Sequence, residues 1–244
     1  MTLNTLSERF QVDVFAKAAA KGGGIFGKKK KKEAAAAAGD FTVEDMMTHS
    51  ASPMPTALLK LSSDGVSKSV KMSPAVLKLV TDDVPLVEVS ATLSKLVKET
   101  CKRSELRDEL FLMVLRTTRA NDDARSAIRA WELTHLTAAT VCPSRDFVGF
   151  VTEYINECAH ADRNSREVRA LAVKALNALK KTMKCGMRRH APITEEIEAI
   201  ANDRFLSTIV FFLDETFEEL PYTAQARSIH WSPYDRVGVV NADP

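Results

Sequence analysis

The chain has 244 residues, of which 45% are apolar and 27% are charged, and its formal net charge is +2. This is the composition of a globular protein long enough to bury a core without disulfides or a structural metal, and it excludes collagen-like and wholly disordered chains. The near-zero net charge excludes a general electrostatic argument for a nucleic-acid partner, so any charged surface must be local.

The first 40 residues are the most biased part of the sequence. Alanine runs flank three consecutive glycines and the five lysines Lys28 to Lys32, and such sequence offers little apolar surface to bury. The stretch GGGIFGKK nearly matches a phosphate-binding loop, but Lys29 stands where the magnesium-binding hydroxyl is needed. We therefore predict a disordered basic arm over residues 1–40, with no nucleotide site.

Apolar residues recur at helical spacing from residue 41 to about residue 202. The first part of this region predicts a short helix within residues 43–50 and a second short helical piece within residues 55–61. A helix over about residues 67–80 follows, which Pro74 should interrupt or restart.

Longer helices are predicted after this point. Apolar residues between Leu86 and Val97 form one helical stripe. Residues suited to helix starts open the later helices, namely Ser104, Asp122 with Asp123, Ser144, Asn164 with Glu167, and Thr194. Gly186 is suited to end the helix that begins near Asn164. The pattern predicts an all-α fold, a compact helical bundle or short helical solenoid.

The pattern of residue types changes at residue 206. Residues 206–220 are β-branched and aromatic with a turn-like Asp214-Glu215 pair, which predicts a strand entering a hairpin. An exposed strand of this kind would invite aggregation, so we expect it to dock on the helical domain. Residues 221–244 show no helical or strand period and are predicted to be a loose tail.

Catalytic and metal-binding patterns are not found in the sequence. The four cysteines are irregularly spaced without a C-x-x-C pair, which is typical of reduced thiols in the cytoplasm. No histidine stands at metal-ligand spacing, and Glu132 with His135 on adjacent helical turns predicts a hydrogen-bonded pair rather than an acid–base dyad. We expect no enzyme activity, catalytic residue, cofactor, metal or transmembrane segment.

The charges are strongly segregated in the C-terminal half. Residues 166–190 carry eight basic side chains and one acidic, whereas residues 191–220 carry eight acidic and one basic. At about 100° per residue, four lysines of the long helix fall within a third of its circumference, and two arginines of the following loop extend them. These residues are Lys174, Lys180, Lys181, Lys184, Arg188 and Arg189.

This basic stripe has two interpretations. It could be a solvated helix face, or it could bind an acidic polymer or peptide. No aromatic side chains are interleaved with the cations, so specific nucleic-acid binding is not expected.

Four segments, taken together and in order, resemble the myosin tail homology 4 domain. They are ELRDELF (Glu105 to Phe111), RAWEL (Arg129 to Leu133), CPSRDFVGFV (Cys142 to Val151) and RRHAPITEEIEAI (Arg188 to Ile200). The version here most resembles the domain of plant and algal kinesin-like calmodulin-binding proteins. In such tails the domain usually precedes a FERM domain, and residues 206–220 resemble the incomplete start of its ubiquitin-like lobe.

The resemblance implies a non-catalytic module of a motor tail, in the cytoplasm and on the cytoskeleton, that binds microtubules or cargo tails. It implies buried structural roles for Trp131, and for Arg107 and Asp108 in a helix–helix contact. Because tubulin tails are acidic, the basic stripe is the expected contact, with Lys174 at its edge. Two alternatives remain: a peptide or cargo adaptor acting with a FERM module, and peripheral binding to anionic membranes.

Overall fold

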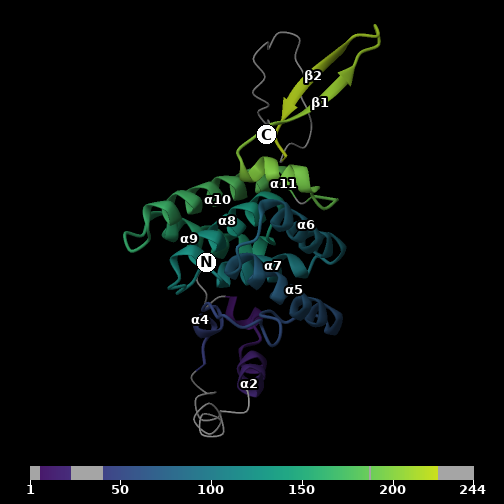
Figure 1. Ribbon diagram of the computed structural model, residues 1–244. Coiled ribbons are helices and arrows are strands. Elements are labelled where there is room, and N and C mark those ends of the chain that lie inside the picture. The colour runs from purple at the N-terminus through teal and green to yellow at the C-terminus, as the bar shows by residue number, and fades with distance from the viewer. Residues whose placement is uncertain (1–5, 23–40, 187, 225–244) are drawn as a thin grey trace.

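The computed structural model describes residues 6–22, 41–186 and 188–224, and most of this chain is helical (Figure 1). The helices are η1 (Ser7–Arg9, 3-10), α2 (Val12–Gly22), α4 (Val43–Met46), α5 (Ser63–Thr81), α6 (Leu86–Lys102), α7 (Leu106–Arg116), α8 (Ala124–Thr140), α9 (Arg145–His160), α10 (Arg166–Cys185) and α11 (Thr194–Ala201). An antiparallel hairpin of β1 (Leu206–Phe211) and β2 (Phe217–Tyr222) follows. The predicted helical fold with a short β segment is confirmed.

The core is built around α7. Nine of its eleven residues are buried, because α5, α6 and α8 all pack against it. A helix surrounded by other helices is buried on almost every side. Trp131 of α8 is buried, as predicted, and its ring stacks on that of Tyr154 with centroids 6.3 Å apart.

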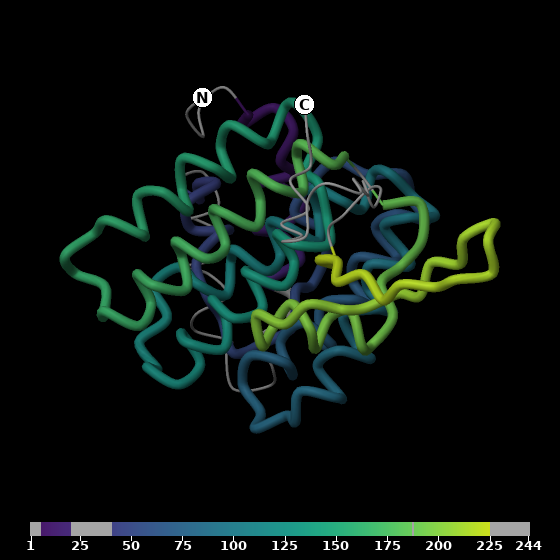
Figure 2. Tube along the Cα trace, turned by 90° about the horizontal axis from the view of Figure 1, so that it is seen from above, coloured from purple at the N-terminus to yellow at the C-terminus, as the bar shows by residue number. Residues whose placement is uncertain are grey.

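The helix α10 lies along α8 and α9, as the view from above shows (Figure 2). It begins one residue later than predicted, because Ser165 rather than Asn164 accepts the hydrogen bond from the Val168 amide. The Asn164 side chain instead donates to the Cys158 carbonyl. Gly186 ends the helix with a φ of 76°, a backbone conformation that glycine adopts without strain.

The N-terminal prediction is wrong for residues 6–22. Leu6, Phe10 and Phe15 are each at most 3% exposed and belong to the core. Phe10 also pairs with Leu59 in an isolated antiparallel bridge. Three large apolar side chains bury enough surface to order this segment, although the average composition of the first 40 residues is that of a disordered chain. Residues 23–40, with the lysine run, lie outside the described chain.

The second short helical piece, predicted within residues 55–61, is instead extended. Glu109 of α7 accepts hydrogen bonds from the amides of Leu58 and Leu59, at 2.8 and 2.9 Å. The Lys60 amide donates to a carbonyl of the N-terminal segment at 2.9 Å. Because these partners come from distant parts of the chain, the backbone has no need of the internal bonds of a helix.

The helix α5 continues through Pro74, where we predicted an interruption. The proline removes one backbone hydrogen bond but lies on the exposed side of the helix, where water can hydrate the freed carbonyl. Met72, Val76 and Leu79 on the other side are buried in the core. Burial of that face keeps the helix continuous.

We predicted that the hairpin docks on the helical body, but it does not. Figure 1 shows β1 and β2 standing away from the helices beyond α11. Ile209, Phe211 and Phe217 are 54%, 74% and 67% exposed. The hairpin ends at Tyr222, two residues beyond the predicted limit, and residues 225–244 lie outside the described chain.

Candidate interaction surface on helix α10

The packing of α10 separates its side chains into two faces. Ala175, Leu176 and Leu179 are buried against the neighbouring helices. Lys180, Lys181 and Lys184 are exposed in its last two turns, and we call these three residues the lysine face. The amphipathic pattern thus places them as the sequence predicted.

The lysine face is unpaired within the described chain. None of its three ammonium groups forms an ion pair or side-chain hydrogen bond with residues 6–22, 41–186 or 188–224. Positive charges near a helix C-terminus are favoured by the helix dipole. Lys180 and Lys184 nevertheless stand one turn apart, where like charges repel. An acidic partner would therefore relieve repulsion as well as add attraction.

Lys174 differs from the lysine face because it already has a partner. Its Nζ lies 2.5 Å from Asp203 Oδ2, just beyond the end of α11. Both side chains are about half exposed, and an exposed pair of this kind contributes little to stability. Lys174 therefore stays at the edge of the basic surface, as predicted, with its charge partly neutralised.

Arg188 does not belong to a free basic surface, contrary to our prediction. Its guanidinium forms a bidentate ion pair with Glu196 of α11, at 2.6 and 2.7 Å, and donates to the Ala224 carbonyl at 2.9 Å. Only 22% of its side chain is exposed. Arg188 is thus a structural residue that fastens the loop after α10 to α11, whereas Arg189 is exposed.

These ion pairs follow from the charge segregation in the sequence. The acidic segment folds back on the basic one, so Glu196 and Asp203 neutralise cations that the linear sequence leaves unpaired. A count of charges along one helix cannot reveal this. The surplus of acidic residues directly after Arg189 is the sequence feature that could have predicted this pairing.

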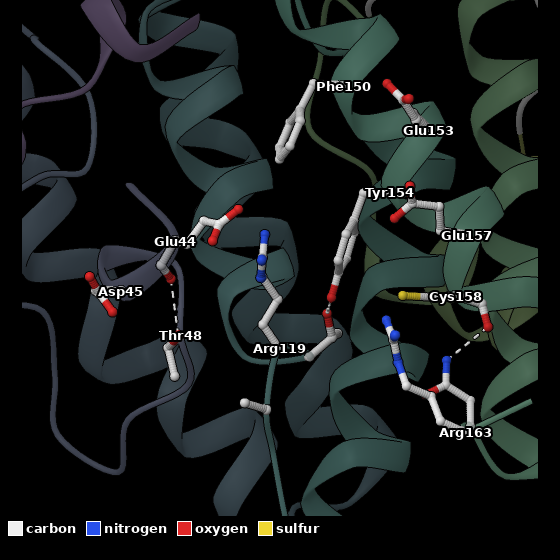
Figure 3. Close-up of a pocket in the computed structure, with 13 residues that line it drawn as sticks. Glu44, Asp45, Thr48, Arg119, Phe150, Glu153, Tyr154, Glu157, Cys158 and Arg163 are labelled. Atoms are coloured by element: carbon white, nitrogen blue, oxygen red, sulfur yellow. Dashed lines mark hydrogen bonds between the residues drawn. The ribbon is translucent and has the colours of Figure 1, made fainter. Parts of the chain in front are cut away.

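A cavity of about 780 Å³ lies between α4, α9 and the loop after α7 (Figure 3). Side chains of both charges line it, including Glu44, Asp45, Arg119, Glu153, Glu157 and Arg163. The Tyr154 hydroxyl lies 2.7 Å from Thr118 Oγ1, and the Arg119 guanidinium lies 5.6 Å from the Tyr154 ring centroid. No histidine lines it, and burial raises the pKa of the Cys158 thiol. These groups form no nucleophile–base pair.

The described ranges also contain no metal-binding cluster. No three His, Cys, Asp or Glu side chains gather there as metal ligands. Burial also raises the pKa of the Cys101 and Cys142 thiols, which favours their protonated form. Among the described helices, none combines the length and apolar character that a membrane crossing requires.

A smaller cavity, about 430 Å³, lies where α8, α10 and α11 meet the connection between α5 and α6. Glu132 and His135 both line it, but the predicted hydrogen bond between them is not present. Glu132 is exposed at the rim, whereas His135 is only 9% exposed. Burial and, to a smaller extent, the charge of Lys174 lower the pKa of His135, so its ring is neutral near pH 7.

Sequence comparison finds relatives among motor proteins. Residues 93–199 match the family model of the MyTH4 domain, inside the predicted span of 41–202. The chain is 45% identical over 225 residues to kinesin-like protein KIN-14I of Oryza sativa subsp. japonica. It is 42% identical over 229 residues to kinesin-like protein KIN-14E of Arabidopsis thaliana. Each alignment covers 89% of this chain, which spans 18% of either relative's length.

Solved structures share the fold at lower identity. The MyTH4-FERM MF1 domain of Dictyostelium discoideum myosin VII aligns with a TM-score of 0.65 at 21% identity, over 74% of this chain and 37% of that one. The C-terminal MyTH4-FERM domain of human myosin 7b, in complex with the harmonin-a PDZ3 domain, aligns with a TM-score of 0.55 at 20% identity. That alignment covers 72% of this chain and 36% of the other.

Proposed function

Because the chain contains a MyTH4 domain, a non-catalytic module of kinesin-like and myosin tails, we propose that it binds microtubules through the lysine face of α10. The partner chemistry is the acidic, flexible tail of tubulin. Binding would place the protein in the cytoplasm, on the cytoskeleton. The predicted contact narrows to Lys180, Lys181 and Lys184, with Arg189 beside them and Lys174 at the edge.

The observation that carries this proposal is the unpaired state of the lysine face within the described chain. Arg188 and Lys174 have acidic partners of their own, yet these three lysines stand together without one. Exposed charges attract a flexible polyanion over about a Debye length, ~8 Å at physiological salt. Because such attraction is screened, the affinity should fall as salt is added.

The test is microtubule co-sedimentation of the full chain between ~50 and ~300 mM salt, with intact and tail-cleaved microtubules. Changing Lys180, Lys181 and Lys184 together to Glu should weaken binding by at least about tenfold, or about 1.4 kcal/mol. The reversal replaces attraction by repulsion on an exposed helix face, so the circular dichroism spectrum should not change. Removal of the tubulin tails should weaken binding of the wild-type protein to a similar degree.

A matched control has the same change in net charge at other exposed lysines, Lys17, Lys60 and Lys71, each changed to Glu. None of them has an ionic partner in the described chain, and the control should bind nearly as well as the wild type. Equal affinity of both triple variants would overturn the proposal. Salt-insensitive capture of a defined peptide would instead favour the adaptor function, and binding that scales with anionic lipid would favour the membrane.

A further inference from the structure

A second group of exposed lysines lies near the end of helix α6. Lys98 and Lys102 stand one turn apart, and both side chains are exposed. The Lys98 ammonium forms no ion pair or side-chain hydrogen bond with another described residue. Lys102 Nζ lies 3.4 Å from Glu99, but Lys68 Nζ contacts the same carboxylate group at 3.3 Å. Because two lysines share one anion there, positive charge remains uncompensated on this helix.

The loop after α10 connects this group to the lysine face. The Arg188 carbonyl oxygen lies 3.8 Å from Cys101 Sγ, and the Ser94 hydroxyl donates to the Pro192 carbonyl at 2.6 Å. The loop therefore runs along α6 over about two helical turns. Arg189, which is exposed, lies within this stretch.

Helical geometry places both lysines of α6 beside the loop. At about 100° per residue, Lys98 projects about 40° and Lys102 about 80° from the direction of Ser94, on the exposed side of the helix. Lys184 of the lysine face precedes Arg188 by four residues, a span of at most about 14 Å. Figure 1 shows α6, α10 and α11 together at the end of the molecule from which the hairpin projects.

One acidic side chain limits the extent of this basic surface. Glu195 is exposed in the first turn of α11 and has no ion pair in the described part of the chain. The helix α11 packs on α6 and begins two residues after the contact of Pro192 with Ser94. Glu195 thus lies beside the middle of α6 and would repel an acidic partner there, so Lys95 is not included in the surface.

We infer that the acidic segment bound by the lysine face continues over Arg189 onto α6, where Lys98 and Lys102 form a second contact. This inference rests on the proposed function and deepens it, because it gives the partner a minimum length. An extended chain advances about 3.3 Å per residue, so a segment of about eight residues spans both groups. Binding at one group then holds the segment close to the other, which raises the overall affinity.

The first experiment is microtubule co-sedimentation of the full chain at ~50 mM salt, where exposed charges are least screened. Changing Lys98 and Lys102 together to Glu should weaken binding at least about threefold, since each exposed contact is weak but both are lost. The matched control changes Lys17 and Lys60 to Glu, two exposed lysines outside α6, α10 and the loop between α10 and α11. It should bind as well as the wild type.

A neutral variant separates lost attraction from a damaged helix. Lys98→Gln with Lys102→Gln adds no acidic group beside Glu99, so the circular dichroism spectrum should not change. Its binding to microtubules should be weakened in the same direction as that of the Glu variant, by a smaller factor. Wild-type affinity of the neutral variant would overturn the inference.

The second experiment tests the length of the partner. Binding of fluorescent glutamate peptides of four and ten residues to the full chain is measured by anisotropy. Changing Lys98 and Lys102 to Glu should weaken binding of the ten-residue peptide at least about threefold. Binding of the four-residue peptide should stay nearly unchanged, because four extended residues span only about 13 Å and remain on the lysine face.

The outcomes separate this inference from the proposed function. Wild-type affinity of the α6 Glu variant for microtubules, with binding still dependent on the lysine face, would overturn the inference and leave the proposed function intact. Loss of dependence on the lysine face would overturn both. Equal weakening of the two peptides by the α6 variant would show that no single segment joins the two groups, and would refute the inference.

Discussion

Glu109 is a carboxyl group with no access to solvent in the middle of the apolar helix α7. Its two oxygens accept hydrogen bonds from the amides of Leu58 and Leu59 and from the Ser69 hydroxyl, at 2.6 to 2.9 Å. Burial raises the pKa of this carboxyl, and the three donors act against that shift. The residue thus substitutes for a neighbouring strand by supplying acceptors to an extended backbone.

We expect Glu109→Gln to lower the free energy of unfolding by about 1–3 kcal/mol. A glutamine side chain of the same size has one acceptor oxygen, so one of the two backbone amides would lose its partner. Urea unfolding followed by circular dichroism measures the change. Glu88→Gln is the control, because Glu88 is about half exposed, and its effect should stay within about 0.5 kcal/mol. Equal effects of the two substitutions would contradict the assigned role.

Asp108, next to Glu109, joins two helices. Its Oδ1 accepts the hydrogen bond of the Ser144 amide at 2.7 Å and so caps the N-terminus of α9 from α7. The Ser144 side chain makes no capping bond itself. The resemblance implied a helix–helix contact for Arg107 and Asp108. It is confirmed for Asp108, whose side chain contacts a helix end, whereas the buried Arg107 Nε has no partner in the described chain.

At the scale of elements, the N-terminal segment is part of the helical domain. Phe10 packs edge-on against Phe147 of α9, with ring centroids 6.1 Å apart. The Arg9 guanidinium lies 5.4 Å from the same Phe147 ring and forms an ion pair with Asp146 at 2.6 Å. The segment therefore connects the extended residues 55–60 with the start of α9, two parts that are distant in sequence.

Phe10→Ala should destabilise the fold by about 3 kcal/mol or more, because it removes a buried aromatic ring and leaves a cavity. Thermal or urea unfolding of the full chain measures this loss. Val14→Ala in the same segment is the control, since Val14 is 52% exposed, and it should change stability little. If Phe10→Ala unfolds like the wild type, the segment does not contribute to the core.

At the scale of the whole molecule, the hairpin is the main unpartnered apolar surface of the described chain. Phe211 and Phe217 pair across its two strands with centroids 6.1 Å apart, and both rings are mostly exposed. Its two strands have no further sheet partner in the described chain. Exposed strand edges with apolar side chains promote association between molecules.

We expect concentration-dependent self-association of the chain, measured by size-exclusion chromatography with light scattering. Changing Phe211 and Phe217 to Ser should reduce it without loss of helical circular dichroism. Val87→Ser removes an exposed apolar side chain from the helical body instead and should leave the self-association unchanged. A monomeric wild-type chain at all concentrations would contradict the prediction.

The sequence by itself determined the helical fold, the hairpin, the family and the lysine face. Each depends on local periodicity or on a motif read along the chain, and side chains at helical spacing share a face wherever the helix packs. The lysine face was predictable for that reason, since the apolar side of α10 decides which side remains outside.

Only the tertiary structure decided which charges are free, which segments are ordered and where a cavity lies. Arg188 was removed from the basic surface by Glu196, and residues 55–61 became extended because Glu109 lies about 50 residues away in sequence but in contact in space. The pocket at His135 is built from five separate parts of the chain. Such features depend on pairs that packing brings together, and no local pattern encodes those pairs.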